Sequence, residues 1–145
     1  MKQKKAAKLL AFLTVIVLAV ICLYRLTSVP SVAYRVDVAP ASAHPEQFAL
    51  AAAENPSVRA QDIDSWRFIT LTVNIESRSP FTTEWLYITP GQGMIPVSGD
   101  PAPVDLPSGE TRTLTLNCLS RQAEYTGSAI LEYYVLGRYH YMGLK

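Results

Sequence analysis

The histidines, cysteines and carboxylates of this sequence do not show the spacing of a familiar catalytic site. Nucleophilic hydrolysis needs a serine or cysteine beside a histidine base. The two histidines are His44 and His140, and no G-x-S-x-G run is present. His140 lies in a tyrosine-rich run that is typical of a strand, and we expect it on the outward, solvated face. We therefore predict no catalytic residue, and a binding protein rather than an enzyme.

Metal and cofactor sites are not predicted either. The nearest approaches to a metal site are the pair Asp62 and Asp64 and the pair Asp100 and Asp105. A calcium loop needs several alternating oxygen ligands and a glycine, and neither pair has that pattern. The run at 91–93 (Gly-Gln-Gly) follows a predicted strand but precedes no helical pattern, so it does not resemble a phosphate-binding loop.

The tyrosines give the strongest surface signal. Five of the eight tyrosines lie in the last 21 residues. In the register that the alternation predicts, Tyr133 points inward and Tyr134 points outward, near Tyr139 or Tyr141 on the returning strand. Tyrosine is enriched at binding hot spots, but it also packs across strands to stabilise a sheet. Tyr134, Tyr139 and Tyr141 are therefore our candidate interface, with sheet packing as the alternative.

A second candidate site is the proline-rich segment at 90–110. Long loops on rigid scaffolds often carry binding or catalytic residues. Asp100, Asp105 and Glu110 would line such a site. This segment is the basis of an alternative prediction, a small surface enzyme or a ligand-binding domain.

The N-terminal segment is apolar enough to cross a membrane. Residues 9–24 have Thr14 as their only polar break and would make about 24 Å of helix, against a hydrocarbon core of ~30 Å. Flanking apolar residues extend the helix. We predict a cytoplasmic basic tail at 1–8, a transmembrane signal-anchor at 9–26, and an extracytoplasmic remainder, because lysines stay on the cytoplasmic side. The alternative is a cleaved signal peptide that ends near Ala33 and releases a secreted protein.

The charge is divided between the two parts of the chain. The net charge is +1, but residues 1–26 carry five basic side chains and no acidic one, which leaves eight basic and twelve acidic side chains beyond them. An acidic body repels phosphate backbones, so nucleic acid is excluded as a partner. The expected partners are the membrane, through a single span, and an unknown extracytoplasmic protein or envelope component.

The remainder of the chain reads as mainly β. We interpret 27–64 as a linker with a weak first strand at 32–38 and one short helix at 46–54. From residue 65 onward, apolar and polar residues alternate, which is typical of half-buried strands. The expected strands lie at 66–76, 83–89, 111–119, 128–136 and 139–144, with short edge pieces between prolines at 94–110. Gly137-Arg138 is expected to form the last hairpin turn.

Cys118 shares the inward face of its strand with Leu114 and Leu116 in this register. Its only partner for an intrachain disulfide would be Cys22, which lies in the predicted membrane helix. Such a bridge is sterically implausible.

One resemblance supports the fold. A turn at 106–110 (Leu-Pro-Ser-Gly-Glu) precedes an alternating strand, and Leu119 and Tyr125 have the six-residue offset of a tyrosine corner. This pattern resembles the immunoglobulin-like or fibronectin type III-like domains of bacterial surface proteins. Arg121 and Ala123 stand where those domains have proline and threonine. The resemblance implies an Ig-like antiparallel β-sandwich over 65–145, and a sandwich of this kind hosts many functions.

Overall fold

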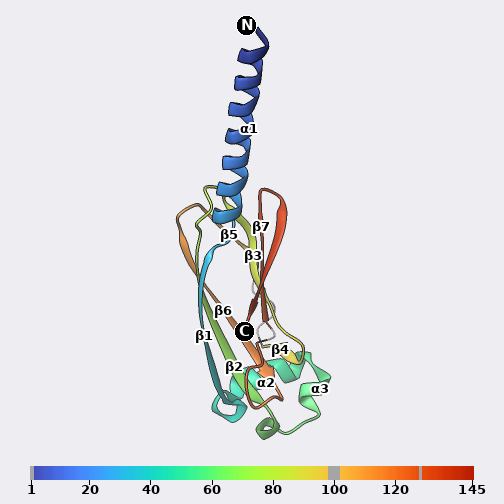
Figure 1. Ribbon diagram of the computed structural model, residues 1–145. Helices are drawn as coiled ribbons and strands as arrows, with labels where there is room; N and C mark the ends of the chain where they lie inside the picture. Colours follow the sequence, from blue (N-terminus) through green and yellow to red (C-terminus); the bar gives the residue numbers. More distant parts are fainter. Residues whose placement is uncertain (1, 98–101, 128) are drawn as a thin grey trace.

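The computed structural model describes residues 2–97, 102–127 and 129–145, and the fold is mainly β (Figure 1). Within these residues the strands form two four-stranded antiparallel sheets. The first sheet has the order β1 (Ser31–Pro40), β2 (Arg67–Glu76), β6 (Thr111–Ser120), β4 (Met94–Pro96). The second has the order β5 (Val104–Leu106), β3 (Thr83–Thr89), β7 (Ala129–Val135), β8 (Arg138–Leu144).

The alternation in the sequence correctly identified the inward face of the central strands. On β2 the predicted inward residues are fully or almost fully buried, and they are Ile69, Leu71, Val73 and Ile75. Cys118 is buried in β6, as are Leu114 and Leu116. These side chains join inward residues of β3, β5, β7 and β8 in one hydrophobic cluster. The two sheets therefore share a core.

The first strand is longer than its weak pattern indicated. β1 pairs with β2 at all ten of its residues, from Ser31 opposite Glu76 to Pro40 opposite Arg67. Its alternation is weak because it lies at the sheet edge, where inward-side residues such as Tyr34 and Val38 are about 40% exposed. The division of the chain at residue 65 into linker and domain stays a prediction.

The short helix was predicted at the correct place. Helix α2 (Pro45–Glu54) begins with proline at its first position, and it is followed by the single turn α3 (Pro56–Arg59), which the Asn55 side chain caps. Both helices lie at the end of the body opposite α1 (Figure 1). Buried residues there form a second cluster, which contains Ala41, Ala51, Val58, Trp66, Phe68, Val97 and Leu119.

The last hairpin turn was predicted one residue too late. The turn is Leu136-Gly137, with φ of 51° and 71°, and Val135 pairs with Arg138. A two-residue turn with positive φ at both central residues matches the right-handed twist of the flanking strands. The expected turn has glycine at its first central position, but in the structure Leu136 occupies that position and Gly137 the second. As a result Tyr134 lies opposite Tyr139.

The prolines confine the segment after β3 to short strands. β4 and β5 have three residues each and lie at the edges of different sheets, as expected for proline-rich pieces. The predicted turn before β6 is present, closed by a 3.2 Å bond from the Glu110 N–H to the Pro107 carbonyl. Asp100, and Ser128 at the start of the predicted fifth strand, lie outside the residues that the structure describes.

Helix α1 (Lys2–Thr27) projects from one end of the β body (Figure 1). Its stretch Lys8–Leu26 has a mean hydropathy of 2.6, and none of its residues is fully buried, although Tyr24 near its end is partly buried against the β body. By length and composition this helix can cross a membrane, and a signal sequence has the same properties. Only residues 28–30 separate α1 from β1.

Candidate functional site

The three candidate tyrosines lie together on the outer face of the second sheet. Tyr134 on β7 is the cross-strand neighbour of Tyr139 on β8, with ring centroids 5.5 Å apart and an interplanar angle of 56°. Tyr141 lies two residues further along β8, and its ring centroid is 6.1 Å from that of Tyr139. Their exposed fractions rise along this series, from 36% to 46% to 70%. Their use as an interface stays a prediction.

Glu132 on β7 lies at the centre of this face. In the sheet it is opposite Tyr87 on β3 and Tyr141 on β8. Its carboxylate accepts hydrogen bonds from the hydroxyls of Thr89 and Tyr139. These bonds fix one carboxylate and one phenol in the middle of an otherwise aromatic surface.

The hydrogen bonds around Glu132 shift the pKa values of Glu132, Tyr139 and Tyr87. The Thr89 hydroxyl, and then that of Tyr139, lowers the pKa of the Glu132 carboxyl. The bond to the same carboxylate raises the pKa of Tyr139 to about 12, and it raises the pKa of Tyr87 as well. At neutral pH the Glu132 carboxylate therefore carries a negative charge, and the phenols of Tyr87 and Tyr139 stay protonated.

Trp85 is added to this face by a bulge in β3. The register of β3 shifts between Glu84 and Tyr87 relative to β7, and both Glu84 and Trp85 are exposed. Trp85 has a φ of 53°, which is uncommon for a bulky residue, and its N–H donates to the Asp105 carboxylate at 3.0 Å. The indole is 62% exposed. Backbone strain of this kind occurs preferentially at functional sites.

Trp85 and its neighbours enclose a shallow depression. The depression is lined by Glu84, Trp85, Tyr134 and Gly137 and has a volume of about 390 Å³. We call the set Trp85, Tyr87, Glu132, Tyr134, Tyr139 and Tyr141 the aromatic face.

The outer face of the first sheet has a different composition. The residues between the inward positions of β1, β2 and β6 are small or polar, and they include Arg35, Asp37, Thr70, Thr72, Asn74, Thr113, Thr115 and Asn117. Arg35 and Asp37 form an exposed ion pair with each other, and Thr113 donates to the Asn74 side chain at 2.7 Å. This is an ordinary solvated sheet face. The two faces of the body are therefore chemically distinct.

The prediction that His140 points outward is wrong. His140 lies opposite the inward residue Tyr133, and the two rings stack with centroids 5.3 Å apart. The outward positions of β8 belong to Tyr139 and Tyr141, so alternation places the histidine on the inner side. Burial lowers the pKa of His140, with Arg138 as the smaller cause. The other histidine, His44, stacks on Phe68 with centroids 4.2 Å apart, next to the second cluster.

Asp105 and Glu110, the two carboxylates of the alternative site that the structure describes, have different partners. Asp105 accepts the bond from the Trp85 N–H, and Glu110 lies 3.8 Å from Arg112. Asp62 accepts from the Asp64 N–H at the start of a 3₁₀ turn. Among the described residues no group of three or more histidines, cysteines or carboxylates could hold a metal ion. The ligand-binding role of segment 90–110 stays a prediction.

Trp85 and Glu132 were missed as members of the site. The spacing of buried residues in β3, which are Thr83, Leu86 and Ile88, is three and then two. That irregular spacing indicates a bulge, and it leaves two consecutive side chains outward. Glu132 carried no comparable signal, because its role depends on Tyr87 and Tyr141, which lie opposite it on the two neighbouring strands.

Comparison with known proteins gave no match to any family model, curated protein or solved structure.

Proposed function

We propose that this chain is a single-pass membrane protein whose extracytoplasmic Ig-like β-sandwich docks a partner protein through the aromatic face. The contrast between the two outer faces carries the proposal. One is polar, and the other presents Trp85 and three tyrosines around Glu132. A sheet face that only contacts solvent can be polar, as the outer face of the first sheet is, and does not need these large aromatic rings.

The sheet order and the shared core support the sandwich. Strands β1, β2 and β6 are neighbours in one sheet, and β3, β7 and β8 in the other. This corresponds to the A, B, E and C, F, G strands of immunoglobulin domains. One detail departs from that plan, since the chain forms β4, beside β6, before it forms β5, beside β3.

The apolar helix α1 supports the membrane anchor. Its N-terminal tail is basic, which favours a cytoplasmic N-terminus and an extracytoplasmic β body. The protein would then reside in the cell membrane, with the aromatic face available to envelope components.

The aromatic face suits a protein partner because its rings are already ordered. Tyr139 is held by Glu132 on one strand and contacts Tyr134 and Tyr141. Ordered aromatic side chains lose little entropy on binding, and tryptophan and tyrosine dominate binding hot spots. Cross-strand packing that only stabilises the sheet is the competing role. It accounts for the pair Tyr134 and Tyr139, but not for the high exposure of Trp85 and Tyr141, which is 62% and 70%.

Affinity capture of the full chain from detergent-solubilised membranes of the producing cell tests the proposal. Tyr141→Ser, at a 70% exposed residue, should reduce recovery of the partner about 30-fold, the size expected for a hot spot of about 2 kcal/mol. The control Thr115→Ser, on the outer face of the first sheet, should not change recovery. A partner retained equally by both variants would exclude the aromatic face as the interface.

A further inference from the structure

A groove lies where α1 meets the β body. Its volume is about 410 Å³, and three parts of the chain line it. These parts are the last turns of α1, the loop before β3 and the β7–β8 hairpin. The hairpin turns at the end of the body that carries α1 (Figure 1). If α1 spans the bilayer as proposed, the groove lies at the level of the lipid headgroups.

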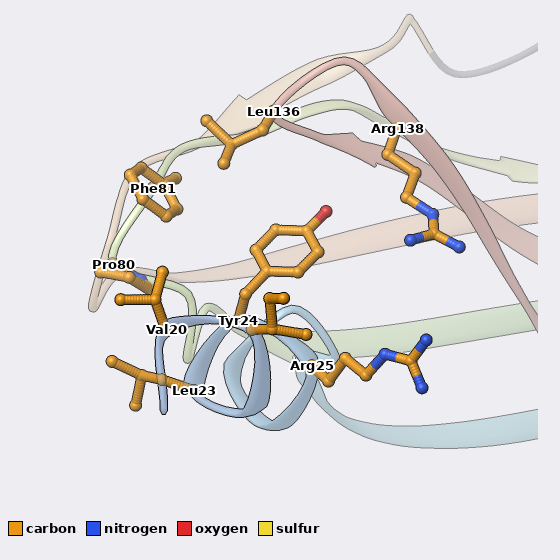
Figure 2. Close-up of a pocket in the computed structure, with 9 residues that line it drawn as sticks. Val20, Leu23, Tyr24, Arg25, Pro80, Phe81, Leu136 and Arg138 are labelled. Atoms are coloured by element: carbon orange, nitrogen blue, oxygen red, sulfur yellow. The ribbon is translucent and has the colours of Figure 1, made fainter. Parts of the chain in front are cut away.

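The groove has an apolar side and a cationic side. Figure 2 shows Tyr24 in the middle, with Phe81 and Leu136 on one side and the separate guanidinium groups of Arg25 and Arg138 on the other. Neither arginine forms an ion pair with any of the residues that the structure describes. Guanidinium groups bind phosphate oxygens through paired N–H donors. The apolar side of the groove thus suits an acyl chain, and the adjacent cationic side suits a phosphate.

The walls of the groove are held together by contacts at the junction. The Tyr24 hydroxyl donates to the Val135 carbonyl at 3.2 Å, and Tyr24 packs against the shared core. The Ser28 N–H donates to the Tyr24 carbonyl at 2.9 Å, and Ser28 is buried. With so short a connection, the body is held close to the end of the span.

Two large apolar side chains, Leu136 and Phe81, are exposed at the end of the β body next to α1. Leu136 is 60% exposed at the hairpin tip and has a positive φ, where glycine or asparagine is favoured. Phe81 is 42% exposed in the neighbouring loop. Both side chains would be buried by lipid, which removes the cost of their exposure to water.

We propose that this groove binds one anionic phospholipid of the outer leaflet. Its phosphate lies between Arg25 and Arg138, and one acyl chain lies along Phe81 and Leu136. Two guanidinium groups favour a lipid with net negative charge over a zwitterionic one. The bound lipid fixes the orientation of the β body relative to the membrane. The inference rests on the proposed membrane anchor.

Native mass spectrometry of the full chain in detergent tests the site. The protein is equilibrated with equal amounts of phosphatidylglycerol and phosphatidylcholine, and one-to-one adducts are counted. Phosphatidylglycerol adducts should exceed phosphatidylcholine adducts at least tenfold. The double variant Arg25→Gln, Arg138→Gln should abolish this preference, whereas Arg35→Gln, on the outer face of the first sheet, should preserve it.

A second variant tests the apolar side without disturbing the fold. Leu136→Gly suits the positive φ, so the hairpin should form, but adducts of both lipids should decrease severalfold. Equal adducts of the two lipids, or a preference unchanged by the double arginine variant, would overturn the proposed site. Extraction of the wild-type chain from membranes by alkaline carbonate would instead show that the anchor itself is wrong, and the site would be rejected with it.

Discussion

At position 85, glycine should stabilise the fold more than alanine, which reverses the usual order in a strand. Trp85 has a φ of 53° at the β3 bulge. An L-residue in this left-handed region costs roughly 1–2 kcal/mol, and glycine avoids that cost. Both variants lose the contacts of the indole. Trp85→Ala keeps the backbone strain, whereas Trp85→Gly relieves it. We therefore expect the glycine variant to exceed the alanine variant by about 1 kcal/mol in free energy of unfolding.

The control position is Thr115, which is exposed in the regularly paired strand β6. There glycine should be about 0.5–1 kcal/mol less stable than alanine. Thermal unfolding of the full chain in detergent, followed by circular dichroism, measures both comparisons. In a domain of this size, about 1 kcal/mol corresponds to about 4 °C in Tm. If alanine equals or exceeds glycine at position 85, Trp85 does not hold the strained conformation and the bulge is wrongly placed.

Three further outcomes are expected. Leu71→Asp should prevent folding because it places a charge in the shared core, whereas Thr72→Asp, on the opposite face of β2, should lower the free energy of unfolding by less than ~1 kcal/mol. Circular dichroism distinguishes the two variants, and equal effects would mean that the inward face of β2 is wrongly assigned. Tyr125→Phe loses a hydroxyl that donates to the Leu144 carbonyl and accepts from the Ala129 N–H. The free energy of unfolding, measured by urea titration, should therefore fall by ~1–3 kcal/mol. An unchanged free energy of unfolding would show that these bonds are absent. The Tyr139 phenol has a folded pKa of about 12, above the ordinary 10.0, so its bond to Glu132 stabilises the fold below pH 10.0 and is lost as the pH rises through about 12. Ultraviolet absorbance titration should show this pKa returning toward 10.0 in Glu132→Ala, and an unchanged titration would remove the carboxylate as the cause.

Most of the strands could be predicted because one face of each is buried and the other is not. Residues 69–75 alternate without interruption, and the structure buries the predicted face. The apolar helix is equally evident, since nothing but lipid or a protein core tolerates such a run. The alternation in β1 is weak because an edge strand exposes part of both faces. The length of β1 is therefore evident from its pairing with β2 and not from its own sequence pattern.

The aromatic face could be predicted only in part. Tyr134, Tyr139 and Tyr141 come together because they alternate along two strands joined by a short turn. Trp85 joins them through a bulge, and a bulge depends on the register of both neighbouring strands. The groove at α1 could not be predicted, because it needs a contact between Tyr24 and Val135, 111 residues apart in the chain.

The most direct test of the aromatic face is site-specific photocrosslinking in intact cells that produce the full chain. Benzoylphenylalanine replaces Tyr141 in one sample and Thr115, on the outer face of the first sheet, in another. We predict one discrete crosslinked product from position 141 and none from position 115. The absence of a product at 141, or the same products from both positions, would contradict the proposal that the aromatic face docks a protein partner.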